Sequence, residues 1–160
     1  MNRTRAKGCR VLYKHLKPRS EVKSKKGYQK RRIALDSLGY ETYSEYLQSD
    51  IWKAIRDARL LELPYCALCA RKATEVHHFC YLDAVLVGLA NDMLLPMCRE
   101  CHHRVEFEGD VKRHLIDAQY FLVHEFNNTG RRVVSDRLMH RYRLLKRQDK
   151  RRKRRKGRHG

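Results

Sequence analysis

The residues best suited to chemistry are cysteines and histidines in closely spaced groups. Cys98 and Cys101 form a CxxC pair, and His102 and His103 follow the second cysteine directly. A second CxxC pair occupies 66–69, and 28 residues separate the two pairs. Thiolates at this spacing are typical of a closed, tetrahedral zinc site, whereas two ligands three residues apart cannot complete a site alone.

The two CxxC pairs therefore predict a structural Zn²⁺ ion bound by four thiolates. The ligands would be Cys66, Cys69, Cys98 and Cys101. Buried reduced thiols or disulfides are the alternative interpretation, and paired cysteines in a reducing compartment more often bind metal. Cys9 and Cys80 have no such partners, so we expect them to be ordinary thiols.

The histidines offer a second group of ligands. His77 and His78 are adjacent, and on an extended strand their side chains would point to opposite sides, so one could hold a metal while the other faces a reactant. On a helix beginning near Cys101, His102 shares a face with Glu106 four residues later. His102 and Glu106 are therefore the predicted metal pair. His103 would be a surface or phosphate-contacting residue, because its partner at that spacing is apolar.

Charge is concentrated at the two ends of the chain. The formal net charge is +19, of which residues 1–32 contribute +12 and residues 141–160 contribute +11, leaving −4 for residues 33–140. Lys and Arg clusters gain affinity for polyanions by releasing counterions from phosphates, so nucleic acid is the expected partner. A solvated tail, a targeting signal or a ribosome-like association are the alternatives, and charge alone does not distinguish DNA from RNA.

The elements that must position these residues follow from periodicity and turn signals. Apolar spacing predicts one or two helices within 40–63, stopped by Pro64. A short strand is expected around Val76, and 80–97 should be an apolar loop or short strand, with Pro96 arguing against a central strand.

Helices are expected on the C-terminal side of the last cysteine pair. The chain should be helical for about two turns from Cys98 until Gly109, and Asp110 should then cap an amphipathic helix over 111–126. A last helix would begin at Ser135 or Asp136 and end in the basic tail.

Four segments follow from these signals. They are a basic arm at 1–32, a helical lead-in with the metal-binding module at 33–109, C-terminal helices at 110–145 and a disordered basic tail at 146–160. No signal peptide or membrane-spanning run is visible, so we expect an intracellular, cytoplasmic protein that does not bind membranes. The sequence leaves the oligomeric state open.

Four stretches of the sequence, taken in order, resemble a known family. "YLQSDIWKAIRDARL", "CALC", "EVHHFCY" and "LLPMCRECHHRVE" are similar to HNH endonucleases of the zinc-knuckle type, which belong to the ββα-metal (His-Me finger) nucleases. The resemblance covers about residues 46–107. It implies an α+β fold in which a small ββα-metal finger is stapled by the Cys₄ zinc site and flanked by helices and basic tails.

The resemblance also implies roles for single residues. His78 corresponds to the general base, and His77 and His102 to ligands of one catalytic divalent metal. Glu106 stands where the family commonly has a further His, and a carboxylate shifts the expected ion toward Mg²⁺ or Mn²⁺, with Zn²⁺ or Ni²⁺ as alternatives.

One position departs from the family. The slot of its middle Asn or Asp is occupied by Met93, so Asn91 or Asp92, one or two residues away, would have to take that catalytic role. The expected function is a metal-dependent HNH endonuclease that hydrolyses phosphodiester bonds of duplex DNA. The alternatives are a non-catalytic zinc-knuckle nucleic-acid-binding protein and an RNA-associated basic protein.

Overall fold

The computed structural model describes the backbone of residues 21–156 and the side chains of residues 28–155. Cys9, most of the basic arm and the last four residues lie outside this range. The elements are α2 (Glu21–Asp36), α3 (Tyr43–Gln48), α4 (Asp50–Glu62), β1 (Glu75–His78), α5 (Asp83–Leu86), η1 (Asn91–Met93), β2 (Leu94–Met97), α6 (Arg99–Glu106), β3 (Phe107–Glu108), β4 (Val111–Lys112), α7 (Leu115–Asn128) and α8 (Arg132–Lys156).

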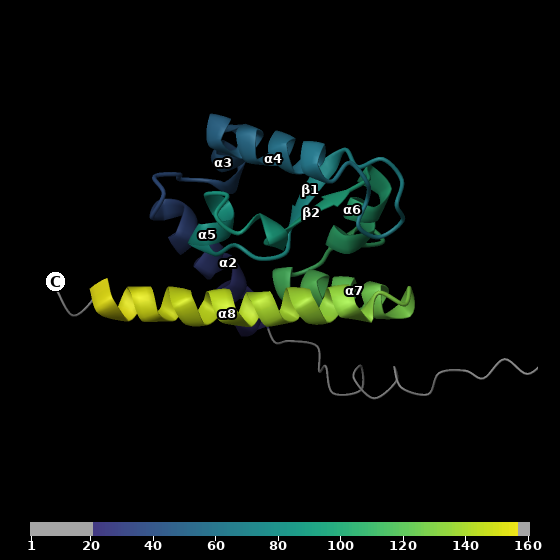
Figure 1. Ribbon diagram of the computed structural model, residues 1–160. Helices are drawn as coiled ribbons and strands as arrows, with labels where there is room; N and C mark the ends of the chain where they lie inside the picture. The colour runs from purple at the N-terminus through teal and green to yellow at the C-terminus, as the bar shows by residue number, and fades with distance from the viewer. Residues whose placement is uncertain (1–20, 157–160) are drawn as a thin grey trace, which may run out of the picture.

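A small antiparallel sheet lies between two helical layers. Strands β1 and β2 pair with His77 opposite Leu95 and His78 opposite Leu94, and α6 follows β2 and packs on β1. Helices α3 and α4 lie on one side of this sheet, while α7 and α8 lie on the other (Figure 1). The α+β class expected from the sequence is confirmed.

The predicted helices before the first cysteine pair are present, divided in two by a double cap at Ser49. The Ser49 hydroxyl accepts a hydrogen bond from the Trp52 amide and donates one to the Tyr46 carbonyl, so it ends α3 and begins α4. Tyr46 and Trp52 are buried, and Pro64 follows the end of α4 as predicted. These caps fix the rings of Tyr46 and Trp52 against the sheet.

Strand β2 contains Pro96, and the sequence predicts that a strand with this proline is not a central one. The sheet has only two strands in the described part of the chain, so both are edge strands and the missing Pro96 amide breaks no ladder. The Pro96 carbonyl accepts a hydrogen bond from the Ala67 amide at 2.9 Å. Pro96 thereby ties β2 to the first cysteine turn.

The prediction that Asp110 caps a helix over 111–126 is wrong. Val111 and Lys112 instead form β4, which pairs with β3 across a two-residue loop in which Gly109 has a φ of +57°. A left-handed glycine suits a tight hairpin turn, and it delays the helix until Leu115. The hairpin places Lys112 near Glu106.

Both ends of the described range, residues 21–156, are more helical than the sequence predicted. Residues 21–32 of the expected arm belong to α2, and α8 begins at Arg132 rather than at Ser135 or Asp136. The helix continues through 146–156, which was expected to be disordered. Lys and Arg are good helix formers, and Asp149 pairs at i,i+3 and i,i+4 with Arg152 and Lys153. Arg152 also binds Asp83.

The core joins the sheet to the helices on both sides. Its fully buried large side chains include Tyr46, Phe79, Met93, Met97, Leu122 and Phe126. Within residues 21–156, none of the helices has the length and apolarity that crossing a membrane requires.

Candidate metal centres and the histidine pocket

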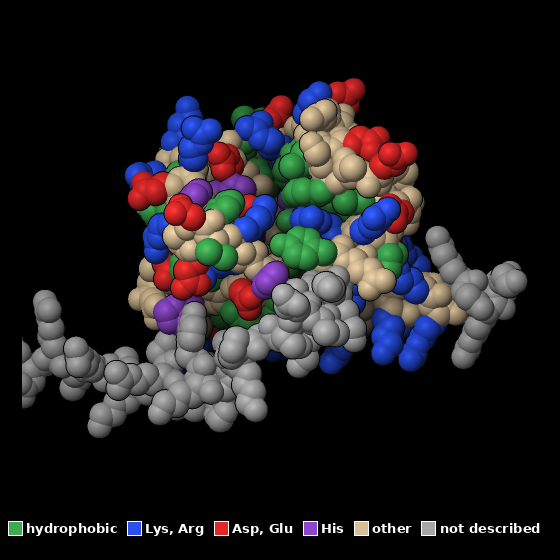
Figure 2. Space-filling model, turned by 180° about the vertical axis from the view of Figure 1, so that it is seen from behind, with side chains coloured by type: hydrophobic (Ala, Val, Ile, Leu, Met, Phe, Trp, Pro, Cys, Tyr) green, Lys and Arg blue, Asp and Glu red, His purple; other side chains and the backbone are tan. Residues whose placement is uncertain are grey.

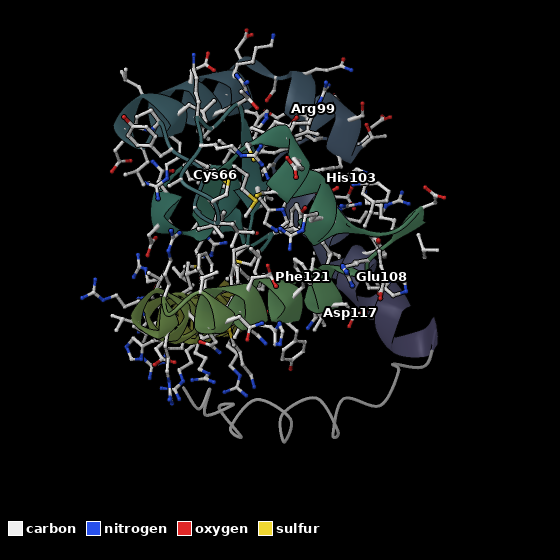
Figure 3. All side chains as sticks on the ribbon, turned by 90° about the vertical axis from the view of Figure 1, so that its right-hand side faces the viewer. Cys66, Arg99, His103, Glu108, Asp117 and Phe121 are labelled. Atoms are coloured by element: carbon white, nitrogen blue, oxygen red, sulfur yellow. The ribbon has the colours of Figure 1, made fainter. Side chains whose placement is uncertain are left out.

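The four predicted zinc ligands converge. The sulfur atoms of Cys66, Cys69, Cys98 and Cys101 all lie within 4.8 Å of one another, and the Sγ atoms of Cys69 and Cys98 are 3.6 Å apart. Four sulfurs at about 2.3 Å from a tetrahedral Zn²⁺ ion would be separated by about 3.8 Å. The Cys₄ cluster is therefore compatible with a structural zinc site, and its sulfur atoms gather beside Cys66 (Figure 3).

Local backbone structure forms the two halves of this cluster. In the first turn, the Ala70 amide donates to the Cys66 carbonyl at 2.9 Å and Ala70 has a φ of +60°. In the second half, Cys98 is the N-cap of α6, and Cys101 lies in its first turn. One CxxC pair lies in a tight turn and the other at the start of a helix. Each pair directs its two sulfur atoms toward the same point.

Arg71 and Glu100 connect the two halves, and the sequence analysis did not identify them. The Arg71 Nε donates to the Cys69 Sγ at 3.4 Å, and its Nη2 donates to the Glu100 carboxylate at 2.6 Å. The hydrogen bond from Arg71 lowers the pKa of Cys69 to about 6. Thiolate is the form that binds metal, so this contact favours the ligand state of Cys69.

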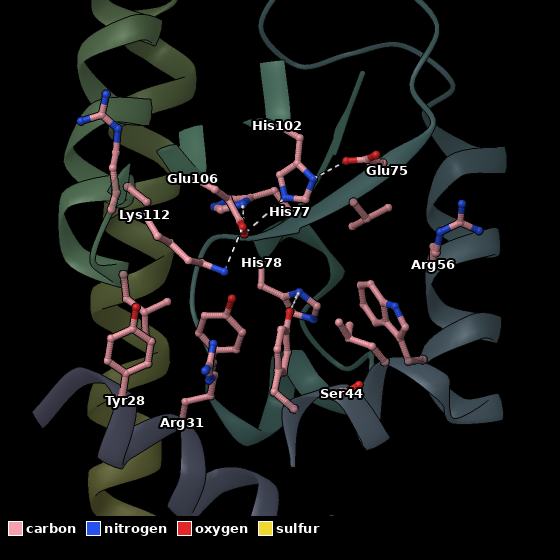
Figure 4. A pocket seen from close by; sticks show the side chains of 18 residues that line it. Tyr28, Arg31, Ser44, Arg56, Glu75, His77, His78, His102, Glu106 and Lys112 are labelled. Atoms are coloured by element: carbon pink, nitrogen blue, oxygen red, sulfur yellow. Dashed lines mark hydrogen bonds and ion pairs between the residues drawn. The ribbon is translucent and has the colours of Figure 1, made fainter. Parts of the chain in front are cut away.

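A second group of possible ligand atoms comes from β1 and α6. Atoms of His77, His102 and Glu106 lie within 4.8 Å of one another, as the helical spacing of His102 and Glu106 predicted. The Glu106 Oε1 lies 3.5 Å from the His102 Nε2 and 3.9 Å from the His77 Nδ1 (Figure 4). Two imidazoles and one carboxylate form a donor set that divalent ions accept.

The His77 side chain supplies a test of whether this group suits a metal. Its Nδ1 is buried and has no hydrogen-bond partner, and burial lowers the pKa of His77 to about 3. An unpartnered buried nitrogen costs roughly 1–3 kcal/mol, which coordination would relieve. A neutral imidazole whose unpartnered Nδ1 faces Glu106 fits a metal ligand.

Glu75, at the start of β1, orients His102. The His102 Nδ1 donates to the Glu75 Oε2 at 2.6 Å, which directs its Nε2 toward Glu106. Burial opposes the charged form of His102, but hydrogen bonds to Glu106 and Glu75 outweigh it and raise its pKa. The hydrogen bond from His102 likewise lowers the pKa of Glu106 to about 2, against the effect of its burial. Carboxylates that hold the second nitrogen of a ligand histidine are a usual feature of metal sites.

His78 is enclosed by aromatic rings. Its ring stacks between Trp52 and Tyr81, with centroids 4.3 and 5.2 Å away. Its Nδ1 lies 3.2 Å from the Tyr43 hydroxyl and its Nε2 lies 3.4 Å from the Tyr46 hydroxyl. Burial, and then the charges of neighbouring histidines, lower the pKa of His78 to about 3, so the ring is neutral near pH 7.

The hydrogen bonds of Tyr46 settle which His78 nitrogen is basic. The Tyr46 hydroxyl donates to the Leu86 carbonyl at 3.0 Å, so it must accept from the His78 Nε2–H. The lone pair of His78 then lies on Nδ1, 3.2 Å from the Tyr43 hydroxyl, which can donate to it. Burial raises the pKa of Tyr43 well above its usual range, so Tyr43 remains a neutral donor.

One pocket contains both the ligand group and His78. It has a volume of about 420 Å³ and is lined by His77, His78, His102 and Glu106 together with basic and aromatic side chains. Arg31, Arg56, Lys112 and Arg113 are its basic lining residues. The residues that line the pocket come from several helices and strands that are far apart in the sequence. Sequence spacing therefore could not predict that they lie together.

The structure does not bring Asn91 or Asp92 into this pocket. Asp92 pairs with Arg141 of α8 at 2.9 Å and lines a separate groove. The Asn91 Oδ1 is buried without a hydrogen-bond partner beside Gly88. Met93, in the slot of the family's middle residue, is fully buried in the core. Neither predicted residue is placed to contact a reacting group.

His103 is exposed, as the sequence predicted. It stacks on Phe107 with ring centroids 4.7 Å apart and lies outside the pocket. Cys80, also predicted to be an ordinary thiol, is buried and free, and burial raises its pKa to about 12.

Comparisons of the chain with protein-family models, with curated proteins and with solved structures find no match. The function must therefore be inferred from the site itself. The basis is the two groups of possible ligand atoms and the pocket between α2, α4, α6 and the β3–β4 hairpin.

Proposed function

We propose that this protein is a metal-dependent endonuclease of the HNH type that hydrolyses phosphodiester bonds of duplex DNA. The observation that carries the proposal is the convergence of His77, His102 and Glu106 beside the neutral His78 in one pocket. A pure binding module would need only the four cysteines. The order of the cysteine and histidine pairs supports the same family.

The proposal includes one divalent ion in this pocket. His77, His102 and Glu106 would hold it, and Mg²⁺ or Mn²⁺ fits a set that includes a carboxylate. When bound, such an ion supplies positive charge that stabilises the phosphate oxygens as the ester bond breaks. Glu75 keeps His102 in the orientation that directs Nε2 to this place.

His78 would accept the proton of the attacking water. Its lone pair is on Nδ1, which faces the Tyr43 hydroxyl at 3.2 Å. Tyr43 lines the pocket, so its hydroxyl can give its proton to Nδ1 and take one from a water in the pocket. This transfer leaves Tyr43 unchanged and His78 protonated, while the hydroxide attacks phosphorus. Positioned bases of this kind contribute about 10²–10⁴-fold to rate.

The basic helices would hold the DNA backbone. The last turns of α8 carry seven consecutive Lys and Arg residues, from Lys150 to Lys156. Lys and Arg side chains line the lower edge of the face in Figure 2, toward the C-terminal end of α8. Such contacts bind phosphates without reading sequence.

A non-catalytic, zinc-stapled nucleic-acid-binding protein is the second candidate, and one observation favours it. His78 is only 3% exposed, and both of its ring nitrogens already face tyrosine hydroxyls. A histidine satisfied in this way can be a core residue that simply completes the packing of the aromatic rings. Whether the protein cleaves DNA distinguishes the two candidates.

The test is incubation of zinc-loaded protein with supercoiled plasmid and Mg²⁺ or Mn²⁺, with and without a chelator. The endonuclease proposal expects open-circular or linear product that requires the added ion. Plasmid that is bound but never cut with either ion would support the binding protein instead.

A further inference from the structure

Arg31 of α2 is held in the pocket by aromatic rings. Its guanidinium carbon lies 4.5 Å from the centroid of the Tyr43 ring, 5.1 Å from that of Tyr28 and 5.3 Å from that of Tyr81. Contacts of a guanidinium with ring faces at these distances are cation–π interactions. Three rings at once fix the position of the guanidinium, and Arg31 points from α2 into the pocket (Figure 4).

The other three basic residues of the pocket each form an ion pair with a carboxylate, and Arg31 differs from them in this respect. Arg56 pairs with Asp57 at 2.7 Å, Lys112 with Glu106 at 3.4 Å and Arg113 with Glu108 at 2.8 Å. Among the residues whose side chains are described, no carboxylate lies within 4.0 Å of the Arg31 guanidinium. Its charge therefore remains available to an anion that enters the pocket.

The ring faces contact the π surface of the Arg31 guanidinium, whose planar fork has five N–H donors. Arg31 also hydrogen-bonds to Tyr81, which engages one of these donors and further fixes the fork. A fixed fork loses little entropy when it binds two oxygens of one phosphate. An arginine that is held by aromatic rings, has no carboxylate of the described side chains within 4.0 Å and lines the same pocket as the ligand group is thus prepared for a phosphate oxygen.

We propose that Arg31 is the residue that binds the substrate phosphate in this pocket, through the nonbridging oxygens of a phosphodiester group. This inference rests on the proposed function for the identity of the substrate, but the anion site itself does not. The aromatic wall formed by Tyr28, Tyr43 and Tyr81 orients the guanidinium. It also couples substrate binding to Tyr43, which contacts His78.

The binding test uses dimethyl phosphate, which has the single negative charge of a nucleotide linkage and no base to stack. It is titrated into full-length, zinc-loaded protein with Mg²⁺ present, and the arginine Nε–H resonances are followed by NMR. The Arg31 resonance, assigned by its loss in Arg31→Lys, should shift saturably, while that of Arg32 should not. Arg32 is the matched control because it is the next residue on α2, has a 78% exposed side chain and faces Asp36 at 3.9 Å.

The kinetic test uses bis(4-nitrophenyl) phosphate, a diester too small to contact the pocket and the basic last turns of α8 at once. With Mn²⁺, Arg31→Ala should raise KM about ten- to a hundredfold, the range for loss of a hydrogen bond between charged groups. Arg31→Lys should recover part of that loss, and Arg32→Ala should have the wild-type KM. Zinc content and Tm of each variant show whether it is folded, and the wild-type titration needs no variant that might unfold.

The outcomes separate this inference from the proposed function. A saturable Arg31 shift in a protein that hydrolyses neither plasmid nor the small diester would support the anion site and contradict the endonuclease. Hydrolysis by a wild type whose Arg31 resonance does not move, with Arg31→Ala retaining the wild-type KM, would overturn the role of Arg31 and leave the endonuclease standing.

Discussion

Glu75 and His102 form a 2.6 Å hydrogen bond that joins the first residue of β1 to the middle of α6. The bond fixes the imidazole so that its other nitrogen faces Glu106 and His77. One strand thus supplies the candidate ligand His77 and, two residues earlier, the carboxylate that orients the candidate ligand His102 on the helix. The geometry of the His77, His102 and Glu106 group depends on the packing of α6 on β1.

The first prediction follows from this bond. Glu75→Gln should weaken binding of Mn²⁺ about 10- to 100-fold, because His102 loses the carboxylate that fixes its ring and raises its basicity. Isothermal titration of zinc-loaded protein measures the affinity. Glu62→Gln is the control, since Glu62 is an exposed carboxylate that pairs with Arg59 away from the pocket. Equal Mn²⁺ affinity for Glu75→Gln and wild type would show that Glu75 has no orienting role.

The second prediction concerns zinc. Cys66→Ser and Cys98→Ser should each release zinc and unfold much of the sheet, because one of four thiolates is removed and structural zinc contributes on the order of 10 kcal/mol or more in small domains. Metal analysis and circular dichroism measure both effects. Cys80→Ala, which alters a buried thiol outside the cluster, should retain one zinc per chain. Stoichiometric zinc and wild-type Tm in either serine variant would refute a Cys₄ site.

Much of this geometry could be predicted from the sequence, because local spacing fixes it. The CxxC pairs, the strand around Val76 and the i,i+4 relation of His102 to Glu106 all depend on neighbouring residues. The roles of Glu75, Arg31 and the tyrosines depend on contacts between distant elements, and no spacing encodes those. The Gly109 hairpin was missed for a related reason, since the apolar pattern over 111–126 did not show that Val111 pairs with Glu108.

The composition of the basic tail does not predict its helix. A run of like charges has no apolar face, which predicts disorder, but α8 is already begun by residues that pack on the core, such as Leu138 and Leu145. Extending an existing helix costs far less than nucleating one. The contacts of Arg152 with Asp149 and Asp83 then add to the extension.

The third prediction concerns pH. The pKa of His78 is about 3 in the folded protein, against an ordinary value of 6.5. Between these values the unfolded chain binds a proton that the folded protein does not, so the free energy of unfolding falls as pH falls. One such group contributes at most about 1.4 kcal/mol per pH unit.

The comparison that isolates this effect is wild type against His78→Phe, in urea unfolding at pH 7, 6 and 5. Zinc loss at low pH affects both proteins, so the difference between their slopes belongs to His78. The wild type should lose more stability on acidification than His78→Phe. Parallel slopes would mean that His78 is not held neutral by its aromatic surroundings.

The fourth prediction concerns the last turns of α8. Replacing Lys150, Arg151, Arg154 and Arg155 with Gln removes four charges and leaves the ion pairs of Arg152 and Lys153 in place. DNA affinity should fall, and the log–log dependence on salt should flatten by about 0.9 for each phosphate that the protein no longer neutralises. Fluorescence anisotropy with a labelled duplex between 50 and 200 mM salt measures both quantities. An unchanged salt slope would assign this segment another purpose, such as binding a protein.

The fifth prediction concerns the proton acceptor. His78→Ala should reduce plasmid cleavage by about 10²–10⁴-fold with zinc content and DNA affinity near wild type. Tyr43→Phe, which removes only the hydroxyl that faces His78 Nδ1, should also slow cleavage if that hydroxyl transfers the proton. Full activity in Tyr43→Phe together with loss in His78→Ala would indicate that water reaches His78 directly.

The measurement closest to the central claim is cleavage of supercoiled plasmid in Mn²⁺ by wild type, His102→Ala and His103→Ala. His102 belongs to the ligand group, whereas its neighbour His103 is exposed and stacked on Phe107 outside the pocket. We expect wild type and His103→Ala to cut at similar rates, and His102→Ala to be inactive with its zinc retained and its activity partly restored by excess Mn²⁺. A wild type that never cuts, or a His102→Ala variant that cuts like wild type, would contradict the endonuclease.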